Sequence, residues 1–119
     1  MSDATTEQLV AVCALEDIDR EGGVAALAHG DVVAVFRTYD DHVHALSNYD
    51  PFGHASVLSR GIVGTRGDRP FVASPLHKQA FDLRTGVCLD DDTVRVTTYP
   101  VVVRDGQVLV GPASGTGRA

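Results

Sequence analysis

Two short proline-containing loops carry most of the reactive side chains that lie close together in this sequence. They read Asp50-Pro51-Phe52-Gly53-His54 and Ser74-Pro75-Leu76-His77. If the loops lie side by side, Asp50, His54 and His77 supply one carboxylate and two imidazoles, the ligand set of open-sided non-haem iron centres. A nucleophilic pair of Ser74 and His77 is disfavoured, because side chains three apart in such a loop rarely face each other and no third orienting group follows. Spacing alone leaves the mononuclear metal site open.

The same two loops resemble those of a Rieske domain, which hold a [2Fe–2S] cluster through two thiolates on one iron and two imidazoles on the other. Rieske loops carry these ligands as Cys-x-His and Cys-x-x-His, and the matching positions here are Asp50, Phe52, Ser74 and His77. Asp and Ser do not replace a soft thiolate ligand, and Phe has no lone pair. With only His77 retained, we expect no cluster and no other cofactor in this chain.

Short strands that alternate with turns must position the two loops. Apolar runs predict strands over residues 9–13, 23–28, 31–38, 42–46, 62–64, 70–74, 80–83, 87–89, 94–97, 99–104 and 107–110. The segments His29-Gly30, Arg84-Thr85-Gly86 and Asp105-Gly106 have the residue types of tight hairpin turns. Because no amphipathic helix is evident, the pattern predicts an all-β fold, a sandwich or small barrel of short antiparallel strands.

One of these strands contains a pair of histidines. Residues 42–46 alternate with period two, so His42, His44 and Leu46 share one face and Val43 and Ala45 share the other. Two imidazoles on one strand face are too few ligands for a metal ion, and no further ligand is close in sequence. We therefore expect the face that carries the histidines to be solvated.

Composition limits the class of protein. The chain has 119 residues, of which 44% are hydrophobic and 22% charged, which is typical of one globular domain. We expect this domain over residues 9–111, a disordered N-terminus over residues 1–8 and a flexible tail over residues 112–119. A formal charge of -6 disfavours nucleic acid and anionic membranes as partners.

Compartment and redox state follow from the same composition. No apolar run approaches the ~18 residues that span a bilayer, and the N-terminus lacks the features of a signal peptide. The sequence therefore predicts a cytoplasmic protein. Cys13 and Cys88 are too few and too far apart to suggest a disulfide framework, so we expect two reduced thiols that act as small hydrophobic side chains.

A longer set of sequence pieces, within roughly residues 8–111, carries a more specific resemblance. The pieces are Asp50-Pro51-Phe52, VLSRGIVG at 57–64, VASPL at 72–76, Lys78-Gln79, Phe81, LRTG at 83–86, CLDD at 88–91 and YPV at 99–101. Together they resemble the small subunit of assimilatory NAD(P)H-dependent nitrite reductase, a family similar to the Rieske fold without its cluster ligands. His77 stands where that family commonly has an aromatic residue.

This resemblance implies a function and a partner. The partner is the large subunit of nitrite reductase, which carries FAD, an iron–sulfur cluster and sirohaem and moves six electrons from NAD(P)H to nitrite, releasing ammonium. The small chain is then a non-catalytic accessory subunit that stabilises or positions the large one. Two alternatives stay open: a Rieske-type ferredoxin of an oxygenase system, disfavoured by the lack of cysteine at positions 50 and 74, and a stand-alone metal-binding or regulatory module that depends on His77.

A loop tip without a cluster is suited to recognition, because loops on a rigid β scaffold present side chains with little ordering cost. Phe52 and Leu76 are the apolar candidates for the centre of a partner interface. The polar rim would consist of Asp50, His54, His77, Lys78 and Gln79. In the competing interpretation, Phe52 fills the space that a cluster would occupy and Leu76 packs beneath it.

Overall fold

The structure is a computed structural model that describes residues 8–113. Its strands are β1 (Val10–Ala14), β2 (Gly22–Ala28), β3 (Asp31–Arg37), β4 (Val43–Ser47), β5 (Tyr49–Asp50), β6 (Ala55–Ser56), β7 (Ile62–Arg66), β8 (Arg69–Ala73), β9 (Ala80–Asp82), β10 (Thr98–Tyr99), β11 (Val101–Arg104) and β12 (Gln107–Val110). Within the described residues, the helical segments are the short 3₁₀ turns η1 (Leu15–Asp17) and η2 (Leu58–Arg60). The predicted all-β class is confirmed. We predicted a disordered N-terminus over residues 1–8 and a flexible tail over residues 112–119, and residues 1–7 and 114–119 of these lie outside the described residues. The proposed domain limits therefore stay a prediction.

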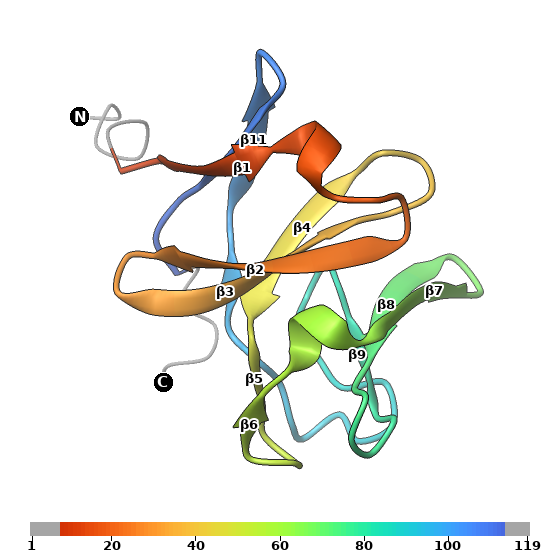
Figure 1. Ribbon diagram of the computed structural model, residues 1–119. Helices are drawn as coiled ribbons and strands as arrows, with labels where there is room; N and C mark the ends of the chain where they lie inside the picture. The colour runs from red at the N-terminus through yellow and green to blue at the C-terminus, as the bar shows by residue number, and fades with distance from the viewer. Residues whose placement is uncertain (1–7, 114–119) are drawn as a thin grey trace.

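Within residues 8–113, all strand pairs are antiparallel, and the strands form four sheets. The largest sheet has the order β10-β4-β3-β2, and the others are β1-β12-β11, β7-β8-β9 and β5-β6. Figure 1 shows β1 and β11 above the largest sheet, and β5 to β9 below it. The two proline-containing loops hang from the lower group and form the lower end of the molecule in this view.

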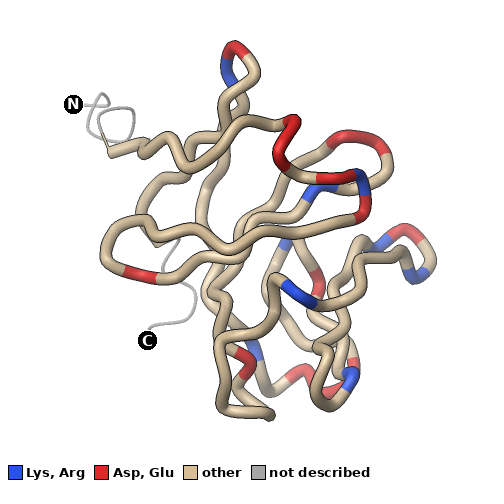
Figure 2. The backbone as a smooth tube through the Cα atoms, viewed as in Figure 1, with Lys and Arg blue, Asp and Glu red and all other residues tan. Residues whose placement is uncertain are grey.

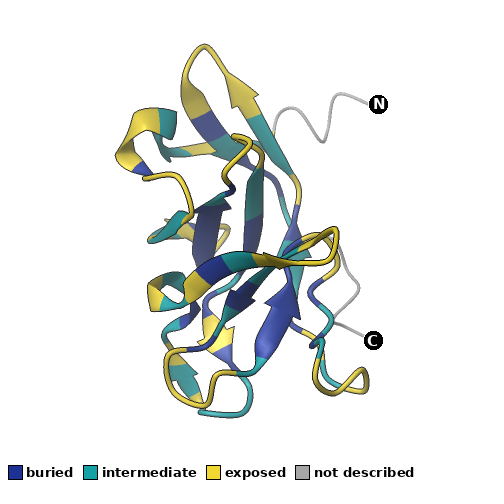
Figure 3. Cartoon of the chain, turned by 90° about the vertical axis from the view of Figure 1, so that its right-hand side faces the viewer, coloured by how far each residue is buried: buried dark blue, intermediate teal, exposed yellow. Residues whose placement is uncertain are grey.

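The largest sheet has a hydrophobic core on each face. On one face, against β7, β8 and β9, lie Ala34, Phe36, Leu46, Leu58, Val63, Val72, Phe81, Leu83, Cys88 and Val96. On the other, against β12, lie Ile18, Ala28, Val33, Val35, Ala45, Tyr99, Val108 and Val110. Strand β3 serves both cores with alternating residues, which is why its sequence is a continuous apolar run. Figure 3 shows the buried residues on these central strands and the exposed residues mainly on the turns.

The prediction of a solvated face on β4 was wrong. Leu46 is 0% exposed and packs in the first core, while Ala45 is buried in the second. His44, opposite Phe36 in the β3–β4 register, is half-buried on the same side as Leu46. The alternation was read correctly, but β4 lies between two cores, so neither face is free. Only His42, just before the strand, is exposed.

Local turn chemistry was predicted more accurately than some strands. His29-Gly30 and Asp105-Gly106 adopt the positive φ values of tight hairpin turns, 54° and 80° in the first pair and 55° and 78° in the second. The expected strands over residues 87–89 and 94–97 are present only as single bridges, Phe81 with Cys88 and Val87 with Arg95. Their amides donate to scattered partners, Leu89 to Ala80 of β9, Cys88 to Val94 and Val96 to Gly86, so no continuous ladder forms.

The turn at Gly86 allows a test of the fold. Gly86 has a φ of 80°, and a Cβ there would lie 2.2 Å from the Val96 carbonyl oxygen. Gly67 has a similar φ of 64° but open space around its Cα.

The two glycines separate the cost of the backbone conformation from the cost of the clash. A positive φ alone costs alanine about 1–2 kcal/mol, so Gly67→Ala measures the cost of the backbone conformation. We expect Gly86→Ala to lower the free energy of unfolding in urea by about 3 kcal/mol or more, because a backbone clash is added. Equal losses in the two variants would contradict this packing.

Candidate functional site

The two loops at the lower end of the molecule have the same backbone form. In the first, the His54 amide donates a hydrogen bond to the Asp50 carbonyl oxygen at 2.7 Å; in the second, the Lys78 amide donates to the Ser74 carbonyl oxygen at 3.0 Å. The residue that closes each loop, His54 or Lys78, has a positive φ, 57° and 63° respectively. We refer to residues 50–54 and 74–79 together as the loop tip.

The first side chain of each loop, Asp50 or Ser74, makes the same kind of hydrogen bond to the loop backbone. Asp50 Oδ1 accepts a hydrogen bond from the Phe52 amide at 2.8 Å, and Ser74 Oγ accepts one from the Leu76 amide at 3.1 Å. The two side chains then meet, because the Ser74 hydroxyl donates a hydrogen bond to Asp50 Oδ2. Both residues are buried, Asp50 at 0% and Ser74 at 1% exposure. This buried hydrogen bond therefore links the two loops.

Asp50 is ionised while it accepts the hydrogen bond from Ser74. Burial acts to raise its pKa, but hydrogen bonds from the Ser74 hydroxyl and from the Phe52 and Gly53 amides lower it, and His77 nearby lowers it further. The net pKa of Asp50 lies below its ordinary value. Hydrogen bonds to a charged acceptor are stronger than those between neutral groups, so the ionised carboxylate is well suited to hold both loops.

The residues predicted for a partner interface divide into an inner and an outer group. Asp50 was placed on the polar rim, which is wrong, because its side chain is fully buried. Phe52 is half-buried on the first core, with its ring centroid 6.1 Å from that of Phe81. This position favours the interpretation in which Phe52 fills the space of a cluster.

The outer group keeps its access to solvent. Leu76 is 48% exposed and does not pack beneath Phe52; it lies against the backbone of Gly53, where a Cβ would come within 2.5 Å of Leu76 Cδ1. His54, His77 and Lys78 are exposed, while Gln79 is half-buried. Residues 51–54 and 75–79 include no Asp or Glu, and the lowest turn of the first loop is tan in Figure 2. The loop tip thus presents a leucine among neutral and basic groups.

The metal sites considered from the sequence do not fit this geometry. Among residues 8–113, no three His, Cys, Asp or Glu side chains are grouped so that they could hold a metal ion. Both Asp50 oxygens accept hydrogen bonds, and His54 Nδ1 lies 3.1 Å from the Tyr49 hydroxyl. At the positions of Rieske ligands, Asp50 bonds to Ser74 and Phe52 packs on Phe81, so the residues do not fit a [2Fe–2S] cluster.

Comparison with known proteins gives the family. A family model for a Rieske-like [2Fe-2S] domain matches residues 8–111. The chain is 47% identical over 98 residues to the nitrite reductase (NADH) small subunit of Salmonella typhimurium, covering 82% of this chain and 91% of that protein. The chain belongs to the Rieske-like family of nitrite reductase small subunits. A crystal structure of an NADH-dependent nitrite reductase small subunit from Mycobacterium tuberculosis has a TM-score of 0.84 at 46% identity, covering 87% of this chain and 94% of that one.

The chain is also similar to two other kinds of protein. The nitrite reductase [NAD(P)H] large subunit of Klebsiella oxytoca is 42% identical over 101 residues, which are 85% of this chain and 10% of that protein. A ferredoxin of carbazole 1,9a-dioxygenase from Nocardioides aromaticivorans shares the fold, with a TM-score of 0.77 at 31% identity over 88% of this chain and 98% of that one. The nitrite reductase resemblance seen in the sequence is confirmed.

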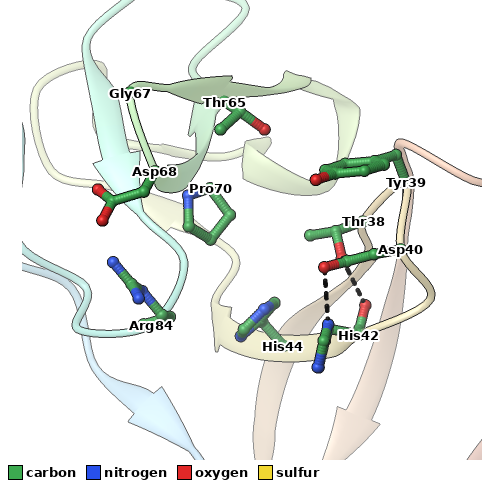
Figure 4. A pocket seen from close by; sticks show the side chains of 10 residues that line it. All are labelled: Thr38, Tyr39, Asp40, His42, His44, Thr65, Gly67, Asp68, Pro70 and Arg84. Atoms are coloured by element: carbon green, nitrogen blue, oxygen red, sulfur yellow. Dashed lines mark hydrogen bonds and ion pairs between the residues drawn. The ribbon is translucent and has the colours of Figure 1, made fainter.

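This family member also has a groove that the sequence did not reveal. It holds about 460 Å³ and opens where the β3–β4 turn faces the β7–β8 turn. Figure 4 shows Tyr39, Asp40 and His42 on one side and Asp68 and Arg84 on the other, with His44 at the bottom. These residues come from turns far apart in sequence, so no local pattern joins them. None of the residues of the loop tip lines this groove.

The charged groups of the groove are partly satisfied within the chain. The Thr38 hydroxyl donates to Asp40, whose other oxygen lies 3.0 Å from His42 Nδ1. Hydrogen bonds from Thr38 and then His42 lower the pKa of Asp40 to about 2. Burial lowers the pKa of His44, and the nearby charges of His42 and Arg84 lower it further. Asp40 is therefore an anion at neutral pH, while His44 is neutral.

No helix of the described residues is long and apolar enough to cross a membrane. Cys13 is half-buried and Cys88 is buried, and both are free thiols, as expected from the sequence.

Proposed function

We propose that this chain is the small subunit of an assimilatory NAD(P)H-dependent nitrite reductase. The observation that carries the proposal is the 47% identity to the Salmonella typhimurium small subunit, over 91% of that protein. In Klebsiella oxytoca a similar stretch is part of a large-subunit chain, which is consistent with a domain that works beside the catalytic subunit. The proposed location is the cytoplasm, where NAD(P)H is available to the enzyme.

The proposed role is accessory. The large subunit would bring FAD, an iron–sulfur cluster and sirohaem, and its reaction would convert nitrite to ammonium with six electrons from NAD(P)H. The positions that match the Rieske cluster ligands hold no thiolate, so in this proposal electrons do not pass through this chain. An effect on turnover would then arise from assembly of the enzyme, from its conformation or from access to its centres.

We place the contact with the large subunit at the loop tip. Leu76 would form the apolar centre, and His54, His77 and Lys78 would form a rim, with Gln79 at its edge. Phe52 would support this surface from beneath, through its packing on Phe81. Loop residues held by a buried tie lose little conformational entropy on binding, which favours such a surface.

The rim can be tested with a pair of single substitutions. Lys78→Asn removes one exposed cation from the loop tip, and Asn tolerates the positive φ of 63° at this position. Arg104→Asn removes one exposed cation from the β11–β12 hairpin, so the change in net charge is the same. We expect Lys78→Asn to weaken binding to the purified large subunit about two- to fivefold and Arg104→Asn to leave it unchanged. Co-elution and a binding titration would measure both, and equal affinities would contradict the placement.

A further inference from the structure

The loop tip consists of two loops that are far apart in sequence, so contacts between the loops must hold them in a fixed relative position. Asp50 and Ser74 are 24 residues apart: Asp50 ends β5, and Ser74 directly follows β8, which belongs to a different sheet. In the described chain, their side chains form the hydrogen bond that links the loops directly. In a Rieske domain a cluster links the two loops, since each loop supplies ligands to it.

We propose that the Asp50–Ser74 hydrogen bond is a metal-free structural substitute for the cluster. It joins the loops at the two positions where the thiolate ligands would stand, and the matching turns on either side keep the loop backbones in register. By this proposal the shape of the loop tip is independent of iron supply and of redox state. The proposal concerns the chain alone and stands whether or not the nitrite reductase partner is correct.

The proposal also implies that the backbone retains a latent metal site. The side chains at positions 50 and 74 already converge to hydrogen-bond distance, so two thiolates there would point to a common iron. His77 is present as one imidazole, near enough to Asp50 to lower the pKa of that carboxyl. Phe52 occupies the position of the second imidazole. Three side chains, at positions 50, 52 and 74, therefore separate this chain from a complete ligand set.

The direct experiment uses the full chain with Asp50→Cys, Phe52→His and Ser74→Cys combined. Its thiols are first reduced and the reductant removed, and the chain is then incubated anaerobically with ferric iron and sulfide, two of each making one diferric cluster; the two cysteines release their protons when they bind iron. We expect two irons and two sulfides per chain and the visible absorption of a [2Fe–2S] cluster, with none in the natural chain. Adding His77→Ala should abolish or alter this spectrum. A triple variant with the circular dichroism and unfolding midpoint of the natural chain, but without bound iron, would overturn the latent site.

A second measurement tests the substitute without any metal. Ser74→Ala removes the donor of the tie, and Ser56→Ala removes an exposed hydroxyl from neighbouring β6. We expect hydrogen exchange of the His54 and Lys78 amides to speed up tenfold or more in Ser74→Ala, and more than exchange of the buried Val35 amide. Ser56→Ala should leave these rates unchanged. Loop exchange that is the same in both variants would refute the structural role of the tie, whatever the triple variant does.

Discussion

Replacing Asp50 with alanine is expected to lower the free energy of unfolding by about 3 kcal/mol or more. The substitution would leave the Ser74 hydroxyl and the Phe52 amide without their acceptor, and each buried, unpaired polar group costs about 1–3 kcal/mol. Asp92→Ala is the matched control, because Asp92 is an exposed carboxylate and its loss should change stability little. Urea unfolding at pH 7 would measure both. Similar stabilities for the two variants would show that the buried carboxylate does not hold the loop tip.

The same carboxylate predicts a pH dependence whose sign can be stated. The pKa of Asp50 is lowered in the folded chain, whereas in the unfolded chain it takes the ordinary value of about 3.9. The ionised group thus stabilises the fold above about pH 4, and this contribution disappears as pH falls through the lowered pKa. In Asp50→Asn the group does not titrate. The stability gap between the natural chain and Asp50→Asn should therefore be constant above about pH 5 and shrink on acidification below pH 4.

Replacing Leu76 with aspartate is expected to weaken binding to the large subunit about 30-fold. The change would place an unpaired charge at the apolar centre of the proposed interface. Loss of a central interface side chain typically costs about 2 kcal/mol of binding free energy. Since Leu76 is 48% exposed, the fold itself should be unaffected. Leu27→Asp is the matched control, because Leu27 is 71% exposed on the β2–β3 hairpin, outside the loop tip.

A titration of the purified large subunit with each variant, alongside its unfolding midpoint, would measure this prediction. Leu76→Asp should lose affinity at an unchanged midpoint, and Leu27→Asp should match the natural chain. If both variants bind like the natural chain, the loop tip is not the contact surface. If both lose affinity equally, the effect comes from net charge and not from position.

The parts of the fold that the sequence predicted well are those decided by neighbouring residues. Asp105-Gly106 and His29-Gly30 form hairpin turns because their residue types accept a positive φ locally. The strands over residues 31–38 and 107–110 follow from their apolar runs, and they are present as β3 and β12. The all-β class follows from many such short pieces.

The parts that were missed depend on contacts between distant residues. The burial of Leu46 follows from the first core, which only the packing of β7–β9 on the sheet creates. Asp50 was expected on a surface rim, as one of the polar residues around Phe52 and Leu76, but carboxylates can be buried when they are paired. Its partner, Ser74, stands 24 residues away, and no local pattern links the two. The sequence did locate both residues correctly, as the first position of each loop.

The interpretation of Phe52 shows where the sequence leaves a choice that packing decides. From its type alone, Phe52 was equally suited to an exposed interface and to filling the inside of the loop tip. Its ring lies 6.1 Å from that of Phe81 and packs on the first core, so the inner role is the one the structure favours. Leu76 takes the exposed role that the two residues were expected to share.

Nitrite-dependent NAD(P)H oxidation by the purified large subunit, measured with and without this chain, tests the accessory role most directly. The chain and the large subunit should co-elute, and the rate of oxidation or the lifetime of activity should rise when the chain is added. Leu76→Asp, added in place of the natural chain at the same concentration, should give a smaller effect. A large subunit that neither binds the natural chain nor changes in rate or lifetime on its addition would contradict the accessory role.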